Sequence, residues 1–574
     1  MGDGGGRPAA NERARPTYTG RLELTWTNKD RTLLAHEDQT YEWVDPADYR
    51  VSEVRLLHDV ARVGEVASDR NRASDNLLIR GDALHALNAL TSIPEFSREY
   101  AGKVKLVYID PPFNTGQAFA DYDDALEHSV WLTMLRDRLI QIRDLLRPDG
   151  TIWLHLDSFE SHRARCVLDE IFGPANFLST VIWQRTTAKS LAQRTMGTLH
   201  EFIHVYGASE SAMLKTLYLP MEDEYVRRRF TQRDDRGPYD TGDLTASSHR
   251  PHLDSGQPWR GFDPSALKRC WAPSRTPLVE AGLTDGQLAT MTIREKLDAL
   301  DAAGYIHFPP GGGFPRFKKY LHNAKGRAIG DLWTDINVIN SQAAERTGFS
   351  TQKPEALIQR IINMATDPGD IVLDCYAGSG TTAAVAHKMG RRWVTSEWSA
   401  DTLSTYISTR LASVVAGADP GGITAAESWT GGGGFRVLDI GPSMFEEVGG
   451  RVYLAEWATN GALGEAVAAQ FGYGYEPDGP FSGRKGKTRL AVIDGLVNEG
   501  VVRILVDQLA DDEKVTICGT AIDPDCRAVL RELRRGSTIK KVPSSILDDY
   551  RIRRRDRIAL ASALDWSAIA EATS

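Results

Sequence analysis

The chain has 574 residues and a mass of 63.4 kDa, and 41% of its residues are hydrophobic and 25% charged. This length exceeds what a single hydrophobic core supports, so we expect two to four domains. No stretch approaches the roughly 20 apolar residues of a membrane span. Five scattered cysteines contain no CxxC pair, which indicates neither a disulfide framework nor a metal site. We therefore expect a cytoplasmic protein without a metal.

The net charge of −9 is unevenly distributed along the chain. Residues 181–330 contain 21 Lys and Arg against 16 Asp and Glu, so this segment is net positive and the remainder is strongly acidic. A local basic surface is what contact with phosphate groups requires, whatever the total charge. The segment is the best candidate for such a surface, with a chance fluctuation of mixed surface charge as the alternative.

Residues 1–20 predict a disordered leader without an apolar core, and residues 21–75 predict a small N-terminal subdomain. From Asn76 onward strands and helices alternate, which is typical of a parallel α/β sheet. In this part the predicted strands are 77–79, 104–109 and 151–156, and the predicted helices are 81–90, 129–146 and 161–172.

Residues 185–330 interrupt this alternation. They are rich in charge, Gly, Pro and Trp and are too long for an ordinary connection, so they predict an inserted domain. The alternation returns afterwards and is followed by a small α/β domain at 431–574. The predicted elements of these parts are a helix at 353–365 with proline near its start, strands at 371–374 and 393–396, a helix at 381–389, and strands at 491–493 and 515–518.

A glycine loop, Asp374-Cys-Tyr-Ala-Gly-Ser-Gly380, connects the strand at 371–374 to the next helix. Doubly wound folds bind their cofactors at this kind of turn, and Gly378 and Gly380 allow the backbone to approach a ligand closely. The spacing is shorter than GxGxxG, which suits a ligand without a pyrophosphate. Glu397 ends the following strand, where an acidic side chain can bind ribose hydroxyls. A purely structural turn is the alternative.

A second loop, Asp110-Pro-Pro-Phe113, follows the strand at 104–109. The two prolines fix the backbone and remove amide donors, so that the Asp110 carboxylate and the Pro111 carbonyl present two acceptors together. Two acceptors suit an exocyclic amine, and Phe113 supplies a flat face for a base. Hydrogen bonds from both N–H groups raise the electron density on the amine nitrogen, and positioning of the reactants contributes ~7–11 kcal/mol. A strand-ending Asp before a Pro-Pro turn is also compatible with a purely structural role.

With both loops in this order, the chain resembles the β-class DNA amino-methyltransferases and, within them, the modification subunits of Type III restriction-modification systems. Family members carry Asp-Pro-Pro-Tyr first, a target recognition domain next, and Phe-x-Gly-x-Gly last. Here these correspond to Asp110–Phe113, 185–330 and Tyr376–Gly380. The resemblance covers residues 76–415. It departs from the family at Phe113, where Tyr is usual, and at Asp157-Ser158, where two acids are usual.

The resemblance implies a Rossmann-like α/β sheet that binds S-adenosyl-L-methionine. The implied domains are a leader (1–20), an N-terminal subdomain (21–75), a catalytic half (76–184), a target recognition insertion (185–330), a cofactor-binding half (331–430) and a C-terminal α/β domain that could dock a partner (431–574). The implied catalytic residues are Asp110, Pro111, Pro112 and Phe113. The implied cofactor-binding residues are Gln352, Lys353, Pro354, Asp374, Tyr376, Gly378, Gly380, Thr381 and Glu397.

Asp110 at the first motif position implies adenine N6 as the target, with cytosine N4 as the alternative. A base in double-stranded DNA must be flipped out before its amine is reachable. The candidate phosphate contacts are Arg227, Arg228, Arg229, Arg316, Lys318, Lys319, Lys325 and Arg327. The implied partners are a helicase-nuclease restriction subunit, which this chain does not contain, and a second copy of the chain. A DNA-recognition subunit with little turnover is a further alternative, and the glycine spacing disfavours a dehydrogenase.

Overall fold

The computed structural model describes residues 23–543, except 36–39, 47, 49, 52, 115–126, 187–195 and 449–450. The predicted leader therefore lies outside the described residues. The chain divides into two compact units: the first runs to Lys215 and resumes at Asp331, and the second is Thr216–Gly330.

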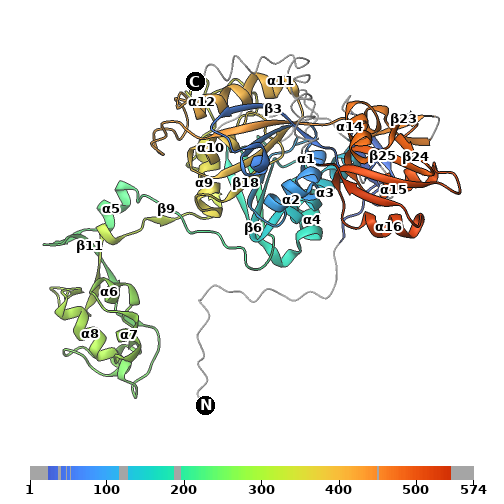
Figure 1. Ribbon diagram of the computed structural model, residues 1–574. Helices are drawn as coiled ribbons and strands as arrows, with labels where there is room; N and C mark the ends of the chain where they lie inside the picture. The colour runs from blue at the N-terminus through green and yellow to red at the C-terminus, as the bar shows by residue number, and fades with distance from the viewer. Residues whose placement is uncertain are drawn as a thin grey trace. The chain divides into compact units, whose positions relative to one another are not determined.

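A mixed sheet forms the centre of the first unit (Figure 1). Its strands are β3 (Leu57–Gly64), β4 (Asn76–Arg80), β5 (Val104–Ile109), β6 (Leu146–Leu156), β7 (Phe177–Gln184), β8 (His200–Gly207), β17 (Leu332–Trp333), β18 (Ile371–Asp374), β19 (Arg392–Glu397) and β20 (Gly434–Ile440). Their order is β17-β7-β8-β6-β5-β18-β19-β4-β20-β3. The run from β6 to β20 is parallel, whereas β8 and β3 pair antiparallel at its two sides. The predicted α/β sheet is confirmed.

Helices cover both faces of this sheet. They are α1 (Ala83–Ser92), α2 (Pro94–Tyr100), α3 (His128–Leu145), α4 (Ser161–Phe172), α9 (Glu355–Ala365), α10 (Thr381–Lys388), α11 (Ala400–Thr402) and α12 (Ser408–Val415). From β4 through β5 to β6 the chain moves in one direction across the sheet, and from β18 through β19 to β20 it moves in the other. Because crossovers are right-handed, α1–α3 and α10 lie on opposite faces, as Figure 1 shows.

The two directions of winding meet between β5 and β18, which are hydrogen-bonded neighbours. At such a switch point the connections leave the sheet on opposite faces, which opens a crevice at the carboxyl ends of the strands. All six residues of β5 and all four of β18 are buried, because helices cover both faces there. The fold therefore brings the two predicted loops to one edge.

The N-terminal and C-terminal segments add smaller elements to the first unit. β1 (Thr32–Ala35) pairs with β2 (Tyr41–Val44), and β21 (Phe445–Val448) pairs with β22 (Arg451–Leu454). A second sheet has the order β23-β24-β25-β26-β27. Its strands and neighbouring helices are β23 (Gly474–Asp478), β24 (Phe481–Lys485), β25 (Thr488–Val497), β26 (Lys514–Ile522), β27 (Thr538–Lys541), α13 (Glu456–Thr459), α14 (Ala462–Phe471), α15 (Glu499–Asp507) and α16 (Cys526–Leu533). The predicted C-terminal domain thus differs at its start, since β20 belongs to the central sheet.

The second unit has a core of its own, which includes Trp259, Trp271, Leu297 and Tyr320. Its strands are β9 (Tyr218–Leu219), β10 (Gln232–Asp234), β11 (Gly237–Asp243), β12 (Thr245–Ala246), β13 (Cys270–Trp271), β14 (Ile306–His307), β15 (Arg316–Tyr320) and β16 (Arg327–Ala328). Its helices are α5 (Asp223–Arg229), α6 (Arg275–Glu280), α7 (Asp285–Thr290) and α8 (Ile293–Ala302). The predicted insertion at 185–330 starts earlier than this unit, because β8 pairs with β6 and β7 in the central sheet.

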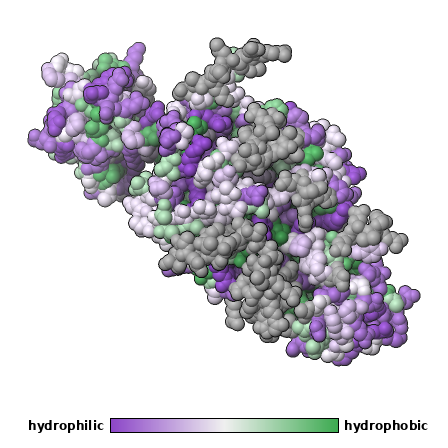
Figure 2. Space-filling view, turned by 90° about the horizontal axis from the view of Figure 1, so that it is seen from above, coloured by the Kyte–Doolittle hydropathy of each residue, from purple (hydrophilic) through white to green (hydrophobic). Residues whose placement is uncertain are grey.

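On the face shown in Figure 2, hydrophobic side chains are scattered among hydrophilic ones. Among the described residues, no helix has the length and apolar character that would let it cross a membrane.

Candidate active site

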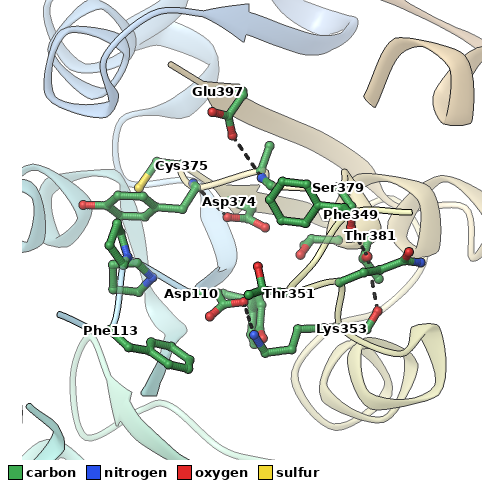
Figure 3. Close-up of a pocket in the computed structure, with 18 of the residues that line it drawn as sticks. Asp110, Phe113, Phe349, Thr351, Lys353, Asp374, Cys375, Ser379, Thr381 and Glu397 are labelled. Atoms are coloured by element: carbon green, nitrogen blue, oxygen red, sulfur yellow. Dashed lines mark hydrogen bonds and ion pairs between the residues drawn. The ribbon is translucent and has the colours of Figure 1, made fainter. Parts of the chain in front are cut away.

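A cavity of about 960 Å³ lies at the edge where β5 and β18 end. It is lined by Asp110–Phe113 from one strand and by Asp374–Ser379 from the other, together with Glu397. Figure 3 shows the labelled side chains of both loops turned toward the same space. The predicted catalytic and cofactor loops therefore share one pocket, although they are far apart in the sequence.

Asp110 is paired with Lys353 inside this cavity. The distance from Lys353 Nζ to Asp110 Oδ2 is 2.5 Å, and the same ammonium lies 5.1 Å from the centroid of the Phe113 ring (Figure 3). Trp131 Nε1 donates a hydrogen bond of 2.7 Å to the Pro112 carbonyl, which ties the loop to α3. The carboxylate and the aromatic face thus both point at one positively charged N–H donor.

The end of the catalytic loop is anchored by a buried acid. Asn114 adopts a left-handed conformation with φ 60° and donates from Nδ2 to Glu160 Oε1 over 3.0 Å. Glu160 also pairs with His128 and, at 2.9 Å, with Arg163. A loop that is held at Trp131 and at Asn114 keeps Asp110 and Phe113 in a fixed geometry.

The cofactor loop is closed by Glu397. The Gly378 amide donates to Glu397 Oε2 and the Ser399 amide donates to Glu397 Oε1, both over 3.0 Å. Gly378 has φ +51°, and a Cβ atom there would lie 3.3 Å from the Phe349 ring. Because only glycine fits this position without strain, the loop can turn sharply here and bring the Gly378 amide against the Glu397 carboxylate. The Asp374 carboxylate accepts from the Tyr376 amide over 3.0 Å, and the Tyr376 side chain lines the cavity.

Two of the predicted cofactor residues shape the loops without lining the cavity. Gly380, with φ 73°, is the N-cap of α10, and Pro354 is the N-cap of α9. Thr381 does line the cavity. Its hydroxyl donates to the Lys353 carbonyl over 3.3 Å and accepts from Arg410 over 2.8 Å, which joins the two helix starts.

Gln352 and Lys353 serve the site in ways that the sequence did not indicate. The Gln352 amide accepts from Thr347 over 2.8 Å and donates to the Glu345 carbonyl over 2.6 Å, so it closes its own loop. Lys353 was expected in the cofactor pocket, yet its ammonium contacts Asp110 of the catalytic loop. The segment therefore links the two halves of the site.

Burial makes the acids of the cofactor loop unusually weak. It raises the pKa of Asp374 to about 8, although hydrogen bonds from Thr382 and Tyr376 oppose the shift. It raises the pKa of Glu397 to about 7 against the hydrogen bonds from Ser399 and Gly378. Both acids are therefore partly protonated near neutral pH.

We expect the affinity for S-adenosylmethionine to rise with pH. A ribose that donates its hydroxyls to Glu397 would favour the ionised carboxylate, and the release of a proton on binding would then strengthen binding as pH rises toward the Glu397 pKa of about 7. Titration calorimetry should show roughly tenfold weaker binding near pH 6 than near pH 8. The Glu397→Gln variant should bind S-adenosylmethionine more weakly, and its affinity should depend much less on pH. This comparison separates the titration of Glu397 from the titration of the ligand itself. Equal slopes in both proteins would contradict the assignment.

The eight candidate phosphate contacts all lie in the second unit and fall into two groups. Three are paired with acids: Arg229 with Asp240 at 3.1 Å, Arg316 with Asp243 at 3.1 Å, and Lys318 with Asp234 at 2.6 Å. The other five make no ion pair with any acid that the structure describes; they are Arg227, Arg228, Lys319, Lys325 and Arg327. These five have the charge most available to an anion.

Several residues of the site were not predicted from the sequence. Tyr41, Phe349 and Trp398 line the cavity from outside the two loops, and no local pattern marks them. Another group could have been found as polar residues within otherwise apolar, buried strands. Tyr108, His155 and Glu201 lie in β5, β6 and β8. Because buried polar groups require partners, polar residues in apolar strands predict a network of polar contacts between those strands.

A family model described as DNA methylase matches residues 104–407. The chain is 30% identical to the Type II methyltransferase M.EcaI of Enterobacter cloacae over 67% of this chain and 76% of that protein. It is 31% identical to the HindVI Mod subunit of Haemophilus influenzae, named as a probable type III restriction-modification enzyme, over 66% of this chain and 56% of that protein. The solved PvuII DNA methyltransferase (cytosine-N4-specific) is 14% identical, over 59% of this chain and 86% of that chain, with a TM-score of 0.31.

The family match includes both loops and the second unit between them. It confirms that the chain is a DNA methyltransferase and, with that, S-adenosylmethionine as the methyl donor. With a family model that spans more than half of its residues, the chain belongs to the N6/N4 DNA methylase family.

Proposed function

We propose that this protein methylates N6 of an adenine that has been flipped out of double-stranded DNA. The observation that supports the proposal best is the position of the Lys353 ammonium, an N–H donor held by Asp110 at 2.5 Å and placed 5.1 Å from the Phe113 ring centroid. A base amine needs these same two contacts, an acceptor for its N–H groups and a flat face for its ring. The ammonium therefore marks the subsite that the amine would take.

The residues of this chain supply positioning and a proton acceptor. When bound, S-adenosylmethionine supplies a methyl group on a positively charged sulfur. Asp110 and the Pro111 carbonyl accept hydrogen bonds from the base amine and hold its lone pair toward the cofactor loop. Asp110 is also the group placed to receive the proton that the amine loses on methylation. Phe113 stacks against the ring of the base and keeps its amine nitrogen beside Asp110.

Adenine is favoured over cytosine by the side chain at the first motif position. In the family that the sequence resembles, adenine enzymes favour Asp there and cytosine-N4 enzymes favour Ser, and this chain has Asp110. Cytosine N4 remains the second candidate, because its amine would meet the same acceptors.

The second unit is proposed to recognise the DNA around the target base. Its five cations without an acidic partner among the described residues would contact phosphates, which set the register of the protein on the duplex. The similarity to M.EcaI and to a Mod subunit supports a role in a restriction-modification system. A helicase-nuclease subunit and a second copy of the chain are the proposed partners.

The test is transfer of labelled methyl from S-adenosylmethionine to unmethylated genomic DNA, followed by separation of the nucleosides. We expect the label in N6-methyladenine. Label in N4-methylcytosine would overturn the assignment of the base and keep the mechanism. Binding of S-adenosylmethionine without any transfer would overturn the proposed activity of the isolated chain and favour a DNA-recognition subunit.

A further inference from the structure

A row of three buried polar side chains lies beneath the catalytic loop. Tyr108, His155 and Glu201 come from β5, β6 and β8, which are consecutive strands of the central sheet. The Tyr108 hydroxyl is 2.8 Å from His155 Nδ1, and His155 Nε2 is 2.8 Å from Glu201 Oε2. None of the three residues is more than 2% exposed. Each ring nitrogen of His155 therefore lies within 2.8 Å of a polar atom of a neighbouring strand.

The two ends of this row differ in charge. Burial opposes the ionisation of Glu201, but the hydrogen bond from His155 and the charges of Lys353 and Arg185 outweigh it and lower the pKa of Glu201 to about 2. Burial raises the pKa of Tyr108, so its hydroxyl keeps its proton. The row therefore runs from the Glu201 carboxylate through the His155 imidazole to a hydroxyl that keeps its proton.

The row is continued at its outer end and braced from the side. Arg185 pairs with Glu201 Oε1 at 2.6 Å, so the carboxylate oxygen that does not face His155 also has a partner. The Trp183 ring meets the His155 ring edge-on, with 5.7 Å between the ring centroids. One hydrogen bond, one close contact with a carboxylate and one aromatic contact hold the imidazole in one orientation.

The fixed imidazole packs against Phe113. Their ring centroids are 6.0 Å apart at an interplanar angle of 43°. Tyr108, Glu201 and Phe113 all line the cavity, so the row forms the wall behind the aromatic face that the base would use. Any rotation of the His155 ring would have to displace Phe113 or break its contact with Tyr108 or Glu201.

We propose that His155 is a positioning residue: it holds the Phe113 ring, and the Phe113 ring in turn positions the target base. The proposal rests on the proposed function, because it deepens the role of the same site. Apolar side chains at these positions would pack the sheet without the cost of burying polar groups. The polar row instead selects one ring orientation, and an apolar side chain free to change rotamer would not hold Phe113 in one plane.

The test compares His155→Leu, His155→Gln and Tyr108→Phe with the wild type. A displacement of about 1 Å can cost roughly a hundredfold in rate, so we expect kcat of His155→Leu to fall by about 10- to 100-fold. The affinity for S-adenosylmethionine should stay unchanged, which also verifies that the variant is folded. His155→Gln keeps a donor for Glu201 and should recover most of kcat. Tyr108→Phe removes one hydroxyl and should show a smaller loss of the same kind.

A double-mutant cycle separates positioning from general stabilisation of the sheet. In a Phe113→Leu background, which has lost the aromatic plane, His155→Leu should reduce kcat by no more than about threefold. An equal loss in both backgrounds, or wild-type kcat in His155→Leu, would overturn the proposal. Absence of methyl transfer by the wild type would count against the proposed function instead, so the two failures are distinguishable.

Discussion

Asp110→Ala is expected to lower the rate of methyl transfer by roughly a thousandfold, the size of effect that a positioned proton acceptor contributes. The change removes the acceptor that the base amine needs, and it releases Lys353 from the ion pair that now spans 2.5 Å. The cofactor loop on β18 keeps its own contacts through Glu397, so binding of S-adenosylmethionine should persist. Single-turnover transfer of labelled methyl and equilibrium binding of the cofactor measure the two quantities.

Asp110→Asn is the matched control for this prediction. It keeps the shape of the side chain and one acceptor oxygen but loses the negative charge and the ability to take up a proton. We expect a loss close to that of alanine if the carboxylate receives the proton. Nearly full activity of the asparagine variant would show instead that hydrogen-bond geometry alone is needed, and full activity of the alanine variant would contradict the assigned role.

Gly378→Ala is expected to weaken binding of S-adenosylmethionine by about 10- to 100-fold. A side chain there must adopt φ +51°, and its Cβ atom would crowd the Phe349 ring at 3.3 Å. Relief of this strain would shift the Gly378 amide away from Glu397, and the added methyl group would leave less space for the cofactor beside the loop. Titration calorimetry with the purified protein measures the affinity directly.

Gly390→Ala provides a control with the same kind of backbone strain. Gly390 has φ +69°, but a Cβ atom there would meet nothing within 4 Å, and the residue does not line the cavity. Both variants should lower the melting temperature, whereas only Gly378→Ala should lower the affinity. Equal affinities for the two variants would show that the glycine loop does not contact the cofactor.

The chemistry proposed for the two loops can be predicted from their local sequence. Prolines fix the backbone around Asp110, and two glycines define the turn after Asp374, so each loop can be recognised from a few neighbouring residues. The strands that precede them were also predictable, because a run of apolar residues bounded by turn residues is a local signal. The order of the loops along the chain then identified the family.

The residues that these loops contact follow only from the three-dimensional fold. Asp110 and Lys353 are 243 positions apart and become an ion pair because the fold brings the end of β5 beside the start of α9. Lys353 has a long flexible side chain, so its partner depends on which acid the fold brings within reach. The row from Tyr108 to Glu201 likewise requires three strands to lie side by side. Contacts between distant strands follow from the winding of the sheet and the burial of its faces, and no local pattern encodes them.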